Sequence, residues 1–130
     1  MSFKMLVVDD SVLMRTALKR TIEMADVGVD EILEAGNGQE GLDLLAENKA
    51  DMIFTDLNMP VMSGFDFIKK LKQTQELSNI PVVIITTESS TVRIEDLQDV
   101  GVADYLHKPF TPEQFRDVIT KNIAVGSQHS

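Results

Sequence analysis

The chain has 130 residues, enough for one domain with a hydrophobic core of its own. It contains no cysteine, so disulfides are excluded, and no apolar run approaches the length that spans a membrane. Its formal net charge of -9 opposes binding to nucleic acid or to anionic membranes. Residues 1–4 lead directly into an apolar run and leave no room for a signal peptide. We therefore expect a cytoplasmic protein.

Short apolar segments recur along the chain and predict β-strands at 5–8, 31–35, 52–55, 82–86 and 104–107. Three of them are nearly continuous apolar runs, which is typical of strands covered by helices on both faces. The strands alternate with segments of helical periodicity, so the sequence predicts a parallel sheet in a doubly wound α/β fold.

Five helices are predicted between and after these strands, at 11–25, 38–47, 65–73, 91–100 and from 111 onwards. On the second helix, Leu42, Leu45 and Ala46 are expected to face the core. The last helix begins with Thr111, followed by Pro112 and, three residues after the threonine, Gln114, which predicts a capping box. We expect residues 1–124 to form the domain and residues 125–130 to be a flexible tail.

Polar residues follow the predicted strands where each one ends. Asp9 and Asp10 follow the first strand, Asp56 the third, Thr86 closes the fourth and Lys108 lies just after the fifth. In an open parallel sheet, ligands bind beyond the carboxyl ends of the strands. The sequence therefore predicts a site at this edge that brings carboxylates, a hydroxyl and an ammonium group together.

The chemistry of this residue set favours a hard divalent cation. Three nearby carboxylates repel one another unless a cation offsets their charge. Oxygen ligands without histidine or cysteine favour Mg2+, which commonly binds one or two carboxylates and a phosphate oxygen. A carboxylate can also be a nucleophile toward phosphorus, and phosphoryl transfer depends mainly on positioning and charge neutralisation. The set thus indicates phosphoryl transfer to an aspartate.

Five motifs in this sequence resemble those of the response-regulator receiver family. In family order, the matching segments are 7–11 (Val-Val-Asp-Asp-Ser), 54–60 (Phe-Thr-Asp-Leu-Asn-Met-Pro), 63–64 (Ser-Gly), 84–88 (Ile-Ile-Thr-Thr-Glu) and 105–110 (Tyr-Leu-His-Lys-Pro-Phe). Together they cover essentially the whole chain. The resemblance implies a flavodoxin-like strand order of 2-1-3-4-5.

The resemblance also implies roles for individual residues at the site. It makes Asp56 the phosphorylation site, with Mg2+ as cofactor and Mn2+ as a substitute. Asp10 would bind the ion directly and Asp9 through water, with Asp56 and the backbone carbonyl of Asn58 as further ligands. Lys108 would pair with the phosphoryl group.

A second group of residues is implied to control the switch. Thr86 would be the switch hydroxyl and Tyr105 the aromatic side chain that changes rotamer. The side chains of Asn58 and Glu88 would flank the phosphoryl group and tune its lifetime. An amide and a carboxylate at these two positions resemble the chemotaxis-type regulators.

The implied partners are a histidine kinase or phosphotransfer domain as donor and a target protein bound by the face of the fourth helix, fifth strand and fifth helix. A phosphatase is a further expected partner, and we expect a monomer that binds neither nucleic acid nor membrane. The resemblance implies a stand-alone regulator with chemotaxis as its setting. It would catalyse only its own phosphorylation and dephosphorylation.

Other interpretations of the same residues stay open at this point. Asp9-Asp10-Ser11 can simply cap the first helix. The acids also suit a small Mg2+-dependent phosphatase with an aspartyl nucleophile, or a phosphorelay intermediate or phosphate sink outside chemotaxis. A flavodoxin-like electron carrier is disfavoured, because Asp9 and Asp10 would repel a flavin phosphate in the first loop.

Overall fold

The computed structural model describes residues 3–56, 61–86, 101–107 and 110–127, with residues 86 and 123–127 described by their backbone alone. It contains one five-stranded, all-parallel sheet of order β2-β1-β3-β4-β5. The strands are β1 (Lys4–Val8), β2 (Glu31–Ala35), β3 (Met52–Asp56), β4 (Val82–Thr86) and β5 (Asp104–His107). The predicted parallel sheet and its strand order are confirmed.

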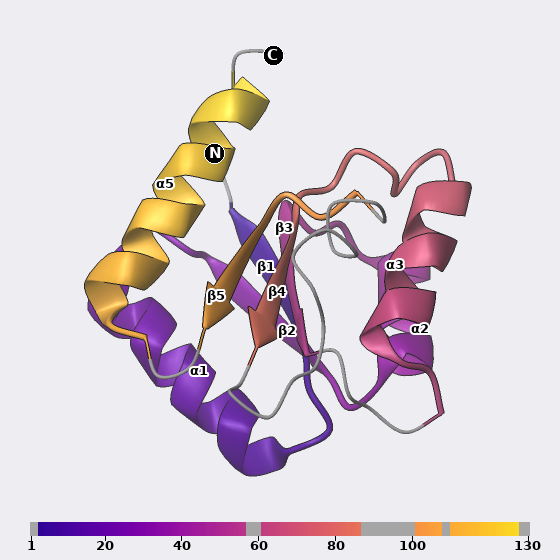
Figure 1. Ribbon diagram of the computed structural model, residues 1–130, viewed down its shortest axis with the longest axis horizontal. Coiled ribbons are helices and arrows are strands. Elements are labelled where there is room, and N and C mark those ends of the chain that lie inside the picture. The colour runs from indigo at the N-terminus through magenta and orange to yellow at the C-terminus, as the bar shows by residue number, and fades with distance from the viewer. Residues whose placement is uncertain (1–2, 57–60, 87–100, 108–109, 128–130) are drawn as a thin grey trace.

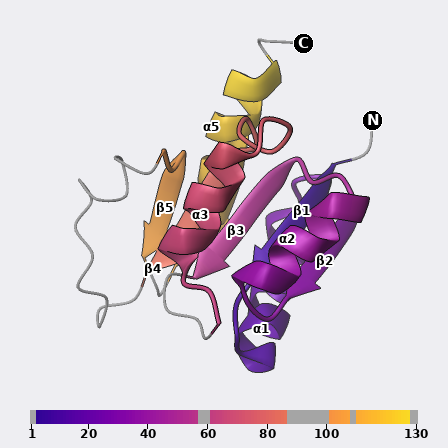
Figure 2. The same cartoon turned by 90° about the vertical axis from the view of Figure 1, so that its right-hand side faces the viewer.

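Helices cover both faces of this sheet. Those described are α1 (Val12–Ala25), α2 (Gly38–Glu47), α3 (Gly64–Gln73) and α5 (Pro112–Ser127). In Figure 1, α1 and α5 lie on one side of the sheet and α2 and α3 on the other. Figure 2 views the molecule from the side of α2 and α3, which lie in front of the strands. The helix predicted at 91–100 falls outside the described residues.

The helix starts follow from short-range hydrogen bonds that the sequence encodes. The Ser11 hydroxyl accepts from the backbone N–H of Met14 at 3.2 Å and caps α1. At the start of α5, the N–H of Gln114 donates to the Thr111 hydroxyl at 3.1 Å, and the N–H of Thr111 donates to the Gln114 side chain at 2.9 Å. The predicted capping box is therefore confirmed. Since α5 continues to Ser127, the domain boundary predicted at residue 124 stays a prediction.

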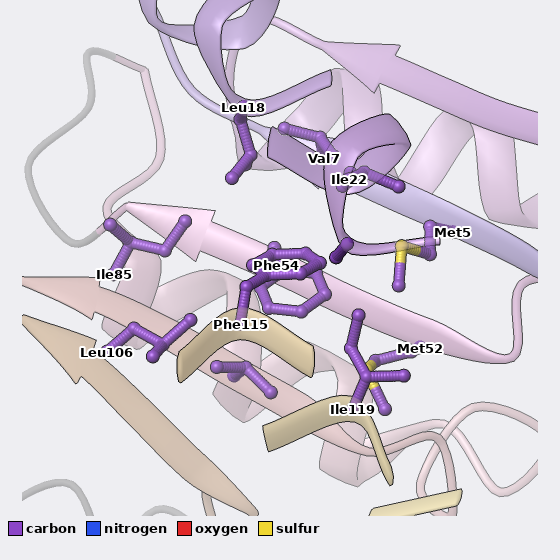
Figure 3. Close-up of a cluster of buried hydrophobic side chains, with 12 residues drawn as sticks. Met5, Val7, Leu18, Ile22, Met52, Phe54, Ile85, Leu106, Phe115 and Ile119 are labelled. Atoms are coloured by element: carbon purple, nitrogen blue, oxygen red, sulfur yellow. The ribbon is translucent and has the colours of Figure 1, made fainter. Parts of the chain in front are cut away.

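The core consists of two apolar clusters, one on each face of the sheet. The cluster under α1 and α5 includes Phe54 and Phe115, whose rings stack with their centroids 4.8 Å apart (Figure 3). The other lies under α2 and α3 and includes Phe67 and Leu71. Strands β1 and β3 are buried over most of their length, whereas the edge strands β2 and β5 are partly exposed. Within the described residues, no helix is both long and apolar enough to cross a bilayer.

Of the residues predicted to face the core from α2, Leu42 is partly buried and packs against the core cluster as expected. Leu45 is buried as expected, but Ala46 is exposed, and Gly38 and Gly41 are buried instead. A Cβ atom on Gly41 would lie 3.1 Å from the ring of Phe67, so the absence of a side chain allows α2 to pack closely against α3. Hydrophobic periodicity does not register glycine as a contact residue, and this is why the prediction missed Gly38 and Gly41.

We expect Gly38→Ala to destabilise the protein by about 1–3 kcal/mol because of overpacking. The added Cβ would lie 2.9 Å from Cβ of Phe67 and 2.9 Å from Sδ of Met62, and the Phe67 atom is next to the backbone and cannot swing away. Urea denaturation followed by circular dichroism measures the change. Helix propensity alone predicts the opposite sign, a gain of up to about 1 kcal/mol.

Ala46→Gly is the matched control on the exposed side of the same helix. It removes a methyl group without altering a close contact, so it should cost about 1 kcal/mol through helix propensity. A Gly38→Ala variant at least as stable as the original protein would contradict the close packing of α2.

Candidate functional site

The candidate site lies at the carboxyl ends of β1 and β3, which are neighbours in the sheet. Their parallel register pairs Val8 with Thr55, so Asp9, just after β1, and Asp56, the last residue of β3, lie side by side. Asp10 follows directly. One carboxylate oxygen from each of the three acids lies within 4.8 Å of the others. The structure therefore brings together the three carboxylates that the sequence predicted to meet.

These acids differ in their access to solvent. Asp9 is buried, with 6% of its surface exposed, Asp56 is half-buried, and Asp10 is exposed. The site is thus closed on the side of Asp9 and open on the side of Asp10. A small charged group could approach Asp56 from solvent without displacing the core.

The loop that carries Asp9 and Asp10 is held by backbone hydrogen bonds. The N–H of Asp9 donates to the carbonyl of Ala35 at the end of β2, 3.0 Å away. The N–H of Ser11 donates to Oδ1 of Asp9 at 2.9 Å, which closes a tight turn. Because Ser11 is the residue that caps α1, capping that helix does not account for Asp9 and Asp10.

A basic side chain that the sequence reasoning missed also contacts this loop. Arg15, in the first turns of α1, donates from Nη1 to the backbone carbonyl of Asp9. Its Nε donates to Oε1 of Glu34 on β2 at 3.3 Å. The available signal was its position one helical turn after Ser11, because side chains on a helix lean back toward the helix start.

The three carboxylates suit a hard divalent cation such as Mg2+. Their oxygens converge from two strands, and no histidine or cysteine accompanies them in the cluster. A cation would offset the repulsion among three negative charges in this small space. Asp9, Asp10 and Asp56 are therefore the described residues that would hold such an ion.

The other predicted site residues are described only in part. Thr86 ends β4, the strand next to β3, and so its backbone lies at the same edge, but its side chain is outside the description. Tyr105 on β5 is 41% exposed, whereas the next residue, Leu106, is buried. Asn58, Glu88 and Lys108 lie outside the described residues, and the roles predicted for them stay predictions.

Comparison with known proteins identifies the class to which this fold and site belong. The family model described as the response regulator receiver domain matches residues 5–120. The chain therefore belongs to the response regulator receiver family.

Similar proteins within this family are chemotaxis regulators. A chemotaxis protein CheY homolog from Campylobacter jejuni is 36% identical over 125 residues, covering 95% of both chains. Chemotaxis protein CheY1 of Helicobacter pylori is 37% identical over 115 residues, covering 88% of this chain and 91% of that protein. The solved structure of the chemotaxis response regulator CheY4 of Vibrio cholerae is 33% identical, with a TM-score of 0.81, and covers 94% of this chain and 99% of that one.

The protein is therefore a receiver domain homologous to single-domain CheY regulators, and it functions in phosphorelay signalling. Such domains are regulators that interact with histidine kinases and downstream targets. The phosphatase alternative and the phosphate-sink alternative are not favoured by these relatives.

Proposed function

We propose that Asp56 of this receiver domain accepts a phosphoryl group from a phosphohistidine of a histidine kinase or phosphotransfer domain. The observation that carries the proposal is the convergence of the Asp9, Asp10 and Asp56 oxygens within 4.8 Å at the open edge of the sheet. Asp56 is the one of these acids that ends a central strand, and its backbone is paired with Ile85 on β4. A nucleophile gains most from being held in place before reaction.

In the proposed transfer, a carboxylate oxygen of Asp56 attacks phosphorus and forms a new P–O bond. The P–N bond of the donor phosphohistidine breaks, and its electron pair remains on the imidazole nitrogen. Mg2+, or Mn2+ in its place, would be held by Asp9, Asp10, Asp56 and the backbone carbonyl of Asn58, and it supplies positive charge that stabilises the transferring phosphoryl oxygens.

Further residues are proposed to stabilise and report the phosphorylated state. The Lys108 ammonium pairs with the phosphoryl group, and the Thr86 hydroxyl donates a hydrogen bond to it. Asn58 and Glu88 flank the group and set how long it persists. Tyr105 turns inward in the phosphorylated state, and this shifts the population of the partner-binding face.

The proposed output is a protein partner that binds the face of the helix predicted at 91–100 together with β5 and α5. Since similar proteins are named as chemotaxis proteins, we propose a chemotaxis pathway as the setting, with the cytoplasm as the compartment. The protein would act as a monomer, with a phosphatase as a further partner. Its catalysis would be limited to its own phosphorylation and dephosphorylation.

Intact-mass spectrometry after incubation with acetyl phosphate tests the phosphoryl transfer. We expect a mass increase of one phosphoryl group in the presence of Mg2+ and none in excess EDTA. Hydroxylamine should remove the adduct, because it cleaves acyl phosphates. An unchanged mass in Mg2+, under conditions that preserve the adduct of another receiver domain, would count against the proposal.

A further inference from the structure

The carbonyl that joins Asp9 to Asp10 is held by the side chain of Arg15. This peptide unit connects two of the three acids of the site, so its orientation determines how their carboxylates are aimed. The N–H groups on either side are held by Ala35 and by the Asp9 side chain, as described above. The Arg15 guanidinium holds the carbonyl itself. Rotation of this unit would change the backbone angles of both aspartates at once.

Arg15 is in turn held by an acid on the neighbouring strand. Its side chain is only 15% exposed, and Nε donates to Oε1 of Glu34. The second oxygen of Glu34 accepts from Nζ of Lys19 at 3.1 Å. Lys19 lies one helical turn after Arg15 on α1, so Glu34 binds both cations and joins α1 to β2. Because a guanidinium presents its donors in a planar fork, Arg15 can bind the carbonyl and the carboxylate together.

We propose that Arg15 is a positioning residue of the divalent-ion site. It orients the Asp9–Asp10 peptide from the outer side, and thereby raises the affinity of the three carboxylates for Mg2+ without contacting the ion. This inference rests on the proposed function, because it takes the acids to be the ion's ligands. Groups that orient metal ligands from outside commonly affect metal affinity strongly.

Because Arg15 is positively charged, a charge effect and a positioning effect change the Mg2+ affinity of Arg15→Ala in opposite directions. A positive charge beside the acids weakens the attraction for a second cation. If charge were its whole influence, Arg15→Ala would bind Mg2+ more tightly and Arg15→Lys would bind as the original protein does. If positioning dominates, Arg15→Ala binds Mg2+ more weakly. Arg15→Lys then lies between, since a single ammonium cannot reproduce the fork.

Isothermal titration calorimetry with Mg2+ on the unphosphorylated protein measures this effect directly. We expect Arg15→Ala to raise the Kd for Mg2+ roughly tenfold. Lys19→Ala is the matched control: it removes one positive charge and one contact to Glu34 from the same helix, and it should leave the Kd nearly unchanged. Urea denaturation in EDTA establishes that each variant is folded. If Arg15→Ala does not fold, the Kd of Arg15→Lys for Mg2+ still tests the proposal.

A kinetic measurement separates positioning from a general loss of function. The rate of phosphorylation by acetyl phosphate is measured as a function of Mg2+ concentration. For Arg15→Ala, the Mg2+ concentration at half-maximal rate should rise in parallel with the Kd, while the maximal rate stays close to that of the original protein. A lower maximal rate with an unchanged Mg2+ requirement would contradict the proposal.

The possible failures can be told apart. If the original protein binds Mg2+ and Arg15→Ala binds it equally well or more tightly, the positioning role of Arg15 is overturned, but the proposed metal site is not. Failure of the original protein to bind Mg2+ overturns the proposed metal site and this inference with it.

Discussion

Replacing Asp56 with asparagine is expected to abolish phosphoryl uptake from acetyl phosphate. The amide has nearly the shape of the carboxylate but lacks its nucleophilic oxygen, so the reaction loses its acceptor while the strand remains intact. Asp56 is half-buried at the end of β3, and Asp9 and Asp10 lie beside it. Intact-mass spectrometry in Mg2+ should show no adduct on the variant under conditions that modify the original protein.

Asp117→Asn is a suitable control for the loss of one negative charge. Asp117 is an exposed acid on α5, and its replacement should leave phosphoryl uptake unchanged. If Asp56→Asn were still modified, peptide mapping would show whether Asp9 or Asp10 had accepted the group. Either result would contradict the assignment of Asp56 as the acceptor.

The Asp56→Asn variant also tests the proposed Mg2+ site, through the effect of Mg2+ on the stability of the protein. Mg2+ that binds the folded protein alone stabilises it by mass action, so it should raise the urea midpoint of the original protein. Asp56→Asn removes one of the three proposed carboxylate ligands, and this increase should become smaller. An equal increase in both proteins would mean that Mg2+ binds elsewhere.

Replacing Phe115 with alanine should cost about 3–5 kcal/mol of unfolding free energy. The side chain is fully buried, and its ring stacks on that of Phe54 at a centroid distance of 4.8 Å. Figure 3 shows the two rings at the centre of the cluster that α5 forms with the sheet. Because domains of this size are stable by about 5–15 kcal/mol, the loss is a large share of the total. Urea denaturation measures it.

Phe110→Ala provides the comparison within the same group of rings. The Phe110 ring lies 6.1 Å from that of Phe115, but its side chain is only partly buried. Its removal should therefore cost clearly less, since less apolar surface returns to water. Equal losses for the two variants, or a loss below about 1 kcal/mol for Phe115→Ala, would contradict the packing of α5 on the sheet.

Much of the fold could be predicted because its signals are local. The strands at 31–35, 82–86 and 104–107 were predicted with the bounds that the structure shows, and the helix caps at Ser11 and Thr111 depend on bonds between residues three apart. By contrast, the buried face of α2 was predicted only in part: Leu42 and Leu45 pack in the core, but Ala46 is exposed and Gly38 and Gly41 are buried. Its position depends on Gly38 and Gly41 approaching Met62 and Phe67, which are distant in sequence.

The candidate site, like the fold, could be predicted in part from the sequence. Asp9, Asp10 and Asp56 could be named because each follows an apolar strand, and strand ends can be located from periodicity. Arg15 could not be named, because its contact with Asp9 depends on where Glu34 lies on β2. Helical periodicity gives the side of a helix on which a residue lies, but not the neighbour that it meets there.

The sequence by itself determined which segments form strands and helices and which residues stand at the strand ends. These properties depend on the period of apolar residues and on side chains a few positions apart. The tertiary structure decided that β1 lies between β2 and β3, so that Asp9 meets Asp56 on one side and Arg15 reaches Glu34 on the other. Strand neighbours are chosen by the burial of both sheet faces at once, which is a property of the whole chain and of no single segment.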